Sequence, residues 1–335
     1  MATNSTSPPQ CKLIITVTDT TNDTILTLLY SLIGIFITVS NLTLIIALPK
    51  IKATFKRFDR LFILLSAVDI CVGILLMPLN IYLIHKNAPG VTCVEVGIKT
   101  LINTFTSVQS GLITCLITND RYLLITNRKL HEEYMTTKCM TGIVLVMFAM
   151  ALSWAVVAVH VSMVAKGVGK ALFFLTFSSY ALIILLEIIV VNIRLRTHLR
   201  AVASKCNNAE ARYKGHVNRT IAEARYKGHV NRTILIISAC LVIAYSPTII
   251  GFMIGSVMTL LQKSEETPSS SAVTFLTWII LPTNLNSGLN SAIFMWRNTA
   301  FRRYLKAICG RNHDVTTIYV THKEHQSGKI NIAIE

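Results

Sequence analysis

Seven long apolar stretches make up most of this chain, and they constrain its fold more than any other feature. An apolar helix of about 20 residues crosses the hydrocarbon layer of a bilayer, which is about 30 Å thick. The stretches cover residues 25–48, 61–84, 98–126, 139–162, 171–193, 233–261 and 272–296. Because 52% of the residues are hydrophobic and only 14% are charged, no large soluble domain is expected. The sequence predicts an all-α, multi-pass membrane protein, with a seven-transmembrane helix bundle over 25–296.

The basic residues indicate how the bundle is oriented. Lys and Arg collect in cytoplasmic loops, and an extracellular N-terminal tail, residues 1–24, would place 26 of the 32 on the cytoplasmic side. Those residues lie in the segments 50–60, 121–138, 194–232 and 297–335. The tail lacks the basic start and apolar run of a cleaved signal, so we expect the first span to act as its own insertion signal. A short amphipathic helix is expected over 297–309, followed by a cytoplasmic tail over 310–335.

The net charge of +16 does not indicate a nucleic-acid partner. The basic residues are dispersed over the cytoplasmic ends of apolar helices, and membrane topology accounts for them. Each one near the surface would attract anionic inner-leaflet lipids by about 1 kcal/mol. We therefore expect inner-leaflet lipids, and no nucleic acid, among the partners.

Several positions outside the spans are candidates for covalent modification. Asn4 and Asn22 begin glycosylation sequons in the extracellular tail. Cys11 and Cys93 both face the oxidising exterior and could form a disulfide, although sequence does not give their separation. Cys309 follows the amphipathic segment beyond the last span, where it is either a palmitoylation site or a plain thiol.

The third cytoplasmic loop, predicted over 194–232, contains an internal duplication. The thirteen residues of Ala209 to Ile221 recur without change in Ala222 to Ile234. An architectural repeat would be longer and would recur at least three times, so we interpret this as either a local tandem duplication or an error of splicing or of the gene model. Only the second copy adjoins the sixth span, and we expect the first copy to lengthen the loop.

Five polar side chains share one layer inside the predicted bundle. Counted at 1.5 Å per residue from the cytoplasmic ends of their spans, all lie about 10–16 Å deep. They are Asn41, Asp69, Ser110, Asn286 and Asn290. An intramembrane carboxylate is a functional-site hypothesis by default, and these oxygens suit a hard cation or a cluster of water. The alternative is a protonated Asp69 that hydrogen-bonds to Asn41 and Asn290.

Asp120-Arg121-Tyr122 closes the third span at the cytoplasmic boundary. One interpretation is an arginine that reaches the interface beside its acidic neighbour, which is a common end for a membrane helix. The other is a switch in which Arg121 exchanges partners. Pro247 interrupts the sixth span and predicts a kink that could act as a hinge, and Pro282 makes a second weak point in the seventh.

These features occur in the order found in one membrane-protein family. The matching segments are Ser40-Asn41, Leu65-Ser66-Ala67-Val68-Asp69, Asp120-Arg121-Tyr122, Trp154, Tyr245-Ser246-Pro247, Asn286-Ser287-Gly288-Leu289-Asn290-Ser291-Ala292-Ile293-Phe294 and Phe301-Arg302-Arg303. Over residues 25–309 the chain resembles a rhodopsin-like (class A) G-protein-coupled receptor.

The resemblance implies a plasma-membrane receptor that binds an extracellular ligand and activates a heterotrimeric G protein. It implies that Arg121 leaves Asp120 on activation while the sixth span swings outward at Pro247, with Tyr122, Tyr245, Asn290 and Phe294 in the switch. It also implies a sodium ion as an allosteric modulator, and arrestin and a receptor kinase as further partners. The residues that would line the sodium pocket are Asp69, Ser110, Asn286 and Asn290.

The chain departs from the family pattern at several of these positions. Tyr245 replaces the tryptophan two residues before the sixth-span proline, while Ser291 and Phe294 replace the seventh-span proline and tyrosine. These changes predict weakened or biased signalling. The loop over 162–170 is short and has no cysteine, and the fifth span has no proline. That combination resembles the melanocortin, cannabinoid, lysophospholipid and adenosine receptors, and it leaves the customary disulfide of the family without its usual partner.

The ligand class follows from the sequence only by exclusion. Asn103 stands where aminergic receptors carry an aspartate, and the seventh span has no lysine for a retinal Schiff base. A small molecule, a lipid or a peptide remains open. The polar and aromatic residues in the outer half are Lys99, Asn103, Phe173, Phe174, Phe177, Phe252 and Trp278. Of these, Lys99, Asn103, Phe252 and Trp278 are the candidate ligand-binding residues.

Two other classes of function fit the sequence less well. A transporter or channel with Asp69 in its pathway would commonly show related halves, and no similarity between the halves is seen. An intramembrane enzyme would need paired ligands or a catalytic group, but the histidines lie in loops, the tail or span ends. The sequence therefore predicts no enzyme and no cofactor apart from the sodium ion.

Overall fold

The computed structural model describes residues 20–51, 57–86, 91–165, 167–210, 217–262 and 270–309, and side chains of most but not all of these. Over these residues the chain is helical and contains no strand, which confirms the predicted all-α class. The helices are α1 (Thr20–Ile51), α2 (Arg57–Cys71), the π-helix η1 (Val72–Leu76), α3 (Met77–His85), α4 (Cys93–Thr126), α5 (Arg128–Tyr134), α6 (Thr137–Val164), α7 (Gly167–Glu210), α8 (Val217–Gln262), α9 (Ser270–Arg297) and α10 (Thr299–Cys309).

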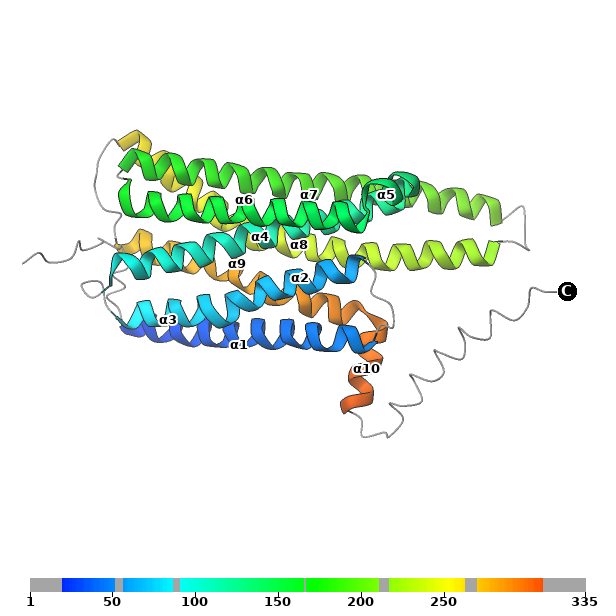
Figure 1. Cartoon of the computed structure of the whole chain (residues 1–335), viewed down its shortest axis with the longest axis horizontal. Helices are drawn as coiled ribbons and strands as arrows, with labels where there is room; N and C mark the ends of the chain where they lie inside the picture. The colour runs from blue at the N-terminus through cyan, green and yellow to red at the C-terminus, as the bar shows by residue number, and fades with distance from the viewer. Residues whose placement is uncertain are drawn as a thin grey trace, which may run out of the picture.

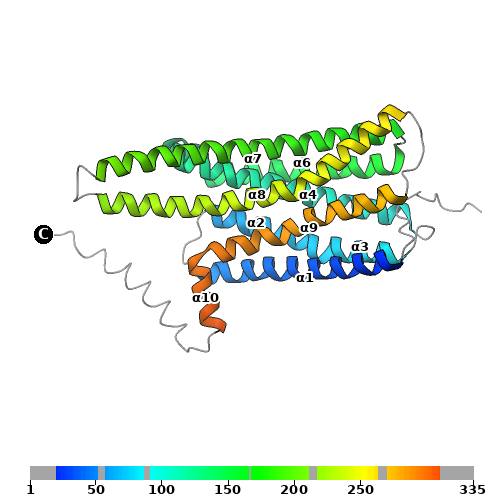
Figure 2. The ribbon, with the colours of Figure 1, turned by 180° about the vertical axis from the view of Figure 1, so that it is seen from behind.

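The long helices run along one axis as a bundle, and α10 turns across one end of it (Figure 1). The extended parts of α7 and α8 lie side by side and project beyond the other helices at that same end, as both views show (Figure 2). Helix α5 also lies at this end (Figure 1). The distribution of basic residues predicts that this end of the bundle faces the cytoplasm.

Six of the described helical segments are long and apolar enough to cross a membrane. They are Thr21–Ile51, Asp59–His85, Cys93–Thr126, Thr137–Val164, Val168–Ala201 and Leu235–Leu261. Helix α9 completes the bundle, and its polar residues from Thr283 to Ser291 are mostly buried inside it. By contrast, α6 and α7 expose large apolar side chains such as Leu145 and Ile183, as expected of helices that face lipid.

Two helices end or begin differently from the limits expected from sequence. Helix α7 continues to Glu210 and α8 starts at Val217, so most of the segment 194–232 is helical. This segment contains no proline and is rich in Ala, Arg and Lys, which favour helix. The second copy of the duplicated stretch belongs to α8, while residues 211–216 of the first copy lie outside the described residues.

Helix α5 was not predicted from the sequence. Its N-terminus is capped by Asn127, whose side-chain oxygen accepts a hydrogen bond from the Leu130 amide at 3.1 Å. The cap starts the short helix immediately after α4 ends at Thr126. As a result His131 is directed back toward the end of α4, where it is buried.

Two apolar clusters hold the ends of the bundle. The cluster at the end that carries α10 joins α1, α2, α4, α6, α8, α9 and α10, and includes Phe62, Phe294 and Phe301. The Phe62 and Phe294 rings lie 4.3 Å apart, and the fully buried Phe301 anchors α10. The cluster at the other end includes Leu26, Tyr30 and Leu281.

Candidate functional site

A cavity of about 410 Å³ lies among α4, α6, α7, α8 and α9. Lys99, Asn103 and Phe252, three of the four residues predicted to bind ligand, line it. Trp278 does not line the cavity, and instead packs against the apolar cluster that contains Leu281. The structure thus brings three of the predicted residues together and leaves Trp278 apart from them.

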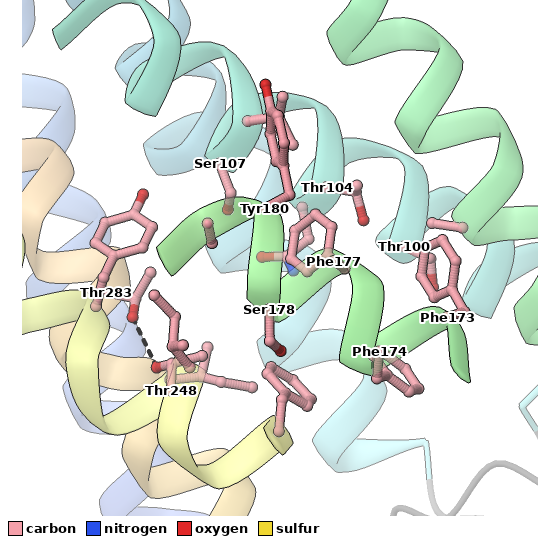
Figure 3. Close-up of a pocket in the computed structure, with 18 of the residues that line it drawn as sticks. Thr100, Thr104, Ser107, Phe173, Phe174, Phe177, Ser178, Tyr180, Thr248 and Thr283 are labelled. Carbon is pink, nitrogen blue, oxygen red and sulfur yellow. Dashed lines mark hydrogen bonds between the residues drawn. The ribbon is translucent and has the colours of Figure 1, made fainter. Parts of the chain in front are cut away.

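One wall of the cavity is aromatic (Figure 3). Phe173 and Phe177 stack at 6.2 Å, and Phe174 stacks almost parallel on Phe252 at 5.2 Å. Trp154, on α6, packs behind this wall with its ring 5.6 Å from that of Tyr180. These contacts join α6, α7 and α8 around one apolar surface.

The inner end of the cavity is formed by hydroxyl groups beside the proline of α8. Thr248 Oγ1, directly after Pro247, lies 2.8 Å from Thr283 Oγ1 on α9 (Figure 3). Each hydroxyl also reaches a carbonyl oxygen of the opposite helix, Ile279 O at 2.7 Å and Ala244 O at 3.1 Å. This contact was not predicted from the sequence, although a threonine beside a helix proline is a known signal of backbone groups that need new partners.

The predicted polar layer meets around Asp69. Asp69, Ser110, Asn286 and Asn290 are all almost fully buried. Asn290 Nδ2 donates to Asp69 Oδ2 at 3.3 Å, and Ser110 and Ser287 lie next to the carboxyl group. Five atoms have no hydrogen-bond partner among the described residues, namely Asp69 Oδ1, Ser110 Oγ, Asn290 Oδ1 and both amide atoms of Asn286.

Asn41 belongs to a second cluster beside this one. Its amide nitrogen donates to Ile37 O at 2.9 Å and to Ser287 O at 3.0 Å, and its oxygen accepts a hydrogen bond from Ser291. Ser291 Oγ is also 3.0 Å from Ser66 Oγ. Of the two hydrogen bonds in the alternative with a protonated Asp69, the one with Asn290 is present, whereas the described hydrogen bonds of Asn41 are made to Ile37, Ser287 and Ser291.

Asp120 has two basic neighbours near the C-terminal end of α4. Arg121 Nε lies 3.6 Å from Asp120 Oδ2, and His131 Nε2 lies 2.9 Å from Asp120 Oδ1. The Asp120 side chain is buried and both neighbours are largely shielded, whereas Tyr122 is half-buried. The histidine on α5 was not predicted, because its contact depends on how α5 packs rather than on any spacing within a span.

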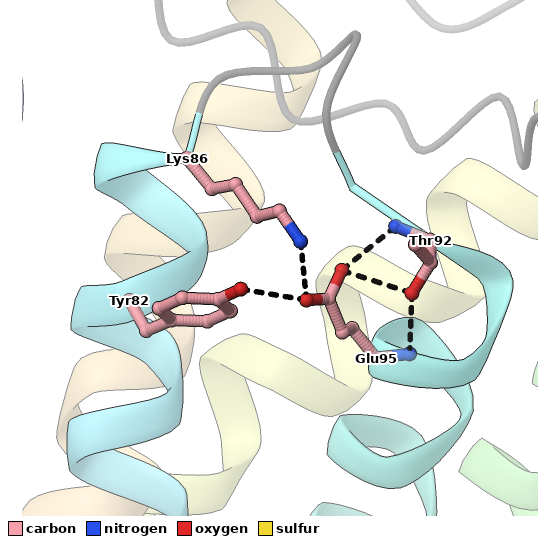
Figure 4. Close-up of polar contacts among 4 residues, drawn as sticks. All are labelled: Tyr82, Lys86, Thr92 and Glu95. Atoms are coloured by element: carbon pink, nitrogen blue, oxygen red, sulfur yellow. Dashed lines mark hydrogen bonds and ion pairs between the residues drawn. The ribbon is translucent and has the colours of Figure 1, made fainter.

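At the opposite end of α4, Glu95 closes the connection between α3 and α4. Its carboxylate accepts hydrogen bonds from Tyr82 Oη at 2.7 Å, Lys86 Nζ at 2.5 Å and the Thr92 amide at 2.7 Å (Figure 4). Thr92 and Glu95 form a capping box that begins the helix. The contact with Glu95 raises the pKa of Lys86. Cys93, between these residues, is disulfide-bonded, while Cys11 lies outside the described residues.

The predicted modification sites Asn22 and Cys309 lie at the two ends of the described part of the chain. Asn22 lies in the first turn of α1 and is half-buried, and Asn4 lies outside the described residues. Cys309 is the last residue of α10, but its side chain is not among those described. Across the part of the chain that the structure describes, no three His, Cys, Asp or Glu side chains gather as metal ligands. A cation near Asp69 would thus be held by one carboxylate with hydroxyl and amide oxygens.

The comparison with known families decides among the functional classes. A family model for the 7 transmembrane receptor (rhodopsin family) matches residues 40–293. The chain belongs to this family. It is a multi-pass membrane receptor with a role in G-protein-coupled signalling, and receptors of this family are not enzymes. The match gives no support to the transporter alternative. No curated protein matches the chain.

Proposed function

We propose that this receptor resides in the plasma membrane with its N-terminus outside, binds an extracellular ligand in the cavity, and activates a heterotrimeric G protein at its cytoplasmic end. The observation that carries the proposal is a succession of buried polar contacts between the two ends. The contacts form three groups, namely Thr248 and Thr283 in the cavity, the Asp69 cluster, and the Asp120 cluster. Polar groups inside a membrane bundle are rare and mark functional paths.

The cavity is coupled to the movable helix by its inner end. The Thr248–Thr283 contact bridges α8 and α9 next to Pro247, where α8 lacks one internal hydrogen bond. Tyr245, which also lines the cavity, lies close to Ser107 on α4. A ligand that displaces these side chains changes the contacts that position α8, so it shifts the balance between two arrangements of the bundle.

The switch at the cytoplasmic end acts through Arg121. In the structure Asp120 holds both Arg121 and His131, so the carboxylate keeps a partner when Arg121 moves away. Outward movement of α8 would then let Arg121 contact the G protein. Tyr122, Asn290 and Phe294 belong to the same rearrangement, and Phe294 would have to leave its contact with Phe62.

The Asp69 cluster fits a sodium ion as an allosteric modulator. The fit rests on the buried oxygens that have no hydrogen-bond partner among the described residues. Asp69, Ser110, Asn286 and Asn290 would hold the ion, and its charge would compensate the buried carboxylate. Since these four side chains come from α2, α4 and α9, the bound cation would favour the closed bundle.

The basic side chains of α10 are the proposed contact with membrane lipids. Arg302, Arg303 and Lys306 of α10 are exposed, and they suit contact with anionic inner-leaflet lipids. Palmitoylation of Cys309 would anchor the end of this helix. We further propose glycans at Asn4 and Asn22, a disulfide between Cys11 and Cys93, and arrestin and a receptor kinase as regulators. The likeness to the melanocortin, cannabinoid, lysophospholipid and adenosine receptors remains a proposal.

The proposal is tested by nucleotide exchange without any ligand. The purified full chain, in lipid nanodiscs, is mixed with a panel of heterotrimeric G proteins, and guanine-nucleotide exchange is measured. We expect basal exchange on at least one G protein, a rise of several-fold in Asp120→Asn, and loss in Arg121→Ala. Lys138→Gln, which changes an exposed lysine at the start of α6, serves as the control. The absence of exchange on every G protein, with Asp120→Asn equally silent, would refute the proposal.

A further inference from the structure

The described residues that line the cavity include two lysines, Lys99 on α4 and Lys170 on α7, and neither aspartate nor glutamate. Neither lysine is within hydrogen-bond or ion-pair distance of another described side chain. A cation in a partly buried site is normally paired, because the loss of hydration is otherwise uncompensated. The positive charge of these two lysines is therefore available to pair with a ligand in the cavity.

The carboxylate best placed to neutralise Lys99 is engaged elsewhere. Glu95 stands four residues before Lys99 on α4, at a spacing that commonly forms helical ion pairs. Its carboxylate instead accepts hydrogen bonds from Lys86, Tyr82 and Thr92 (Figure 4). These contacts hold the acid against the α3–α4 connection, so it does not reach the cavity.

The other residues that line the cavity indicate what the uncharged part of the ligand would be. The stacked rings of Phe174 and Phe252, with Phe173 and Phe177, offer an apolar surface (Figure 3). Ser178 lines the cavity, is 1% exposed, and its hydroxyl has no hydrogen-bond partner among the described residues. The Ser178 hydroxyl can therefore form a hydrogen bond with a polar atom of a ligand. A cavity of about 410 Å³ lies in the range of sites for drug-sized molecules.

We propose that the ligand is a small amphipathic anion, with a carboxylate or phosphate group held by Lys99 and Lys170 and an apolar body against the phenylalanine wall. This assignment rests on the proposed function, because it takes the cavity to be the ligand site of the receptor. A charge-assisted hydrogen bond between the ammonium and the anion supplies affinity as well as direction. The excess of positive charge also attracts anions to the opening of the cavity.

The test uses four probes that share one chain and differ in the head group. Decanoate, decyl phosphate, decanol and decylamine are added to the purified full chain in phosphatidylcholine nanodiscs, and the thermal unfolding midpoint is followed against probe concentration. We expect decanoate, decyl phosphate or both to raise the midpoint, while decanol and decylamine raise it less. The better of the two anions identifies the head group.

Variants establish whether the effect arises in the cavity. Lys99→Gln should raise the concentration of anion needed for half of the shift by roughly 10- to 100-fold, as expected for loss of a hydrogen bond to a charged group. Lys99→Arg should retain most of the response, and Lys99→Glu should transfer the preference to decylamine. Lys138→Gln removes the same charge from the cytoplasmic end and should change nothing.

Three results would overturn the inference: no shift with either anion, an equal shift with decanol, or an unchanged response in Lys99→Gln. The last would mean that the lysine ammonium only reaches water. This assay contains no G protein, and the exchange assay contains no ligand. Failure of the anion inference can therefore be distinguished from failure of the proposed receptor function.

Discussion

Replacing Ser291 by alanine should destabilise the bundle and raise basal G-protein activation. The serine hydroxyl donates to Asn41 Oδ1 and lies 3.0 Å from Ser66 Oγ, so it joins α9 to α1 and α2. All three side chains are buried. Alanine would remove both hydrogen bonds and leave the Asn41 oxygen and the Ser66 hydroxyl without these partners.

The size of the effect follows from the two hydrogen bonds that alanine removes. Hydrogen bonds between helices inside a membrane contribute about 0.6 kcal/mol on average and about 1.7 kcal/mol at most. Removing two of them therefore lowers the free energy of unfolding by about 1–3 kcal/mol. In soluble domains of 150–250 residues, each kcal/mol shifts the midpoint by about 2–4 °C, and a longer chain should shift less. We thus expect a decrease of a few degrees.

The assay is thermal unfolding of the full chain in nanodiscs, with basal nucleotide exchange measured on the same sample. Ser153→Ala is the matched control, because the Ser153 hydroxyl is exposed on α6 and donates to Ala149 O of its own helix. The expected result is a lower midpoint and higher basal exchange in Ser291→Ala alone. Equal midpoints for the two variants would show that the hydroxyl does not hold α9 in place.

Three further substitutions test other parts of the path. His131→Phe removes the partner that Asp120 keeps when Arg121 moves away, so basal exchange should fall several-fold; unchanged exchange would exclude a role for α5 in the switch. Thr248→Val breaks the hydroxyl contact between α8 and α9 and should lower the free energy of unfolding by about 1 kcal/mol. Thermal unfolding measures this change, and an unchanged midpoint would contradict the prediction. Sodium chloride should raise the unfolding midpoint more than choline chloride at equal ionic strength, and Asp69→Asn should abolish the difference; if the variant keeps it, the ion binds elsewhere.

The features that were predictable from sequence are those that depend on helix length and depth. Hydropathy indicated the membrane-spanning segments, and counting residues from the ends of the spans placed Asp69, Ser110 and Asn290 in one layer. The structure brings these side chains together, because helices packed side by side preserve depth. A count along the helix axis needs no knowledge of how each helix is rotated.

The features that were missed depend on rotation and on local packing. Trp278 was expected to face the cavity, yet Ile280, which does line it, is two residues away and points about 200° around the helix. Depth alone does not distinguish these positions. His131 and Thr248 were missed because their partners lie on other helices, at separations of 11 and 35 residues. Lys170 was missed because its role depends on the absence of acids among the described residues that line the cavity.

The departure from the family pattern at position 291 is explained by the contacts around it. Where the family has a proline that interrupts the seventh span, this chain has Ser291, which keeps its backbone amide and adds a hydroxyl bound to Asn41. Asn41 nevertheless donates to Ser287 O, the carbonyl that a proline at position 291 would leave without its helical donor. The site is therefore already arranged to accept proline.

Ser291→Pro should be tolerated far better than Ala292→Pro, one residue further along. A proline at position 292 would leave the carbonyl oxygen of Gly288 without its helical donor, and the only replacement among the described residues is the weaker contact from Ser40 Oγ at 3.4 Å. Comparable unfolding midpoints for the two proline variants would show that Asn41 does not compensate, and that the closed bundle depends on an unbroken α9.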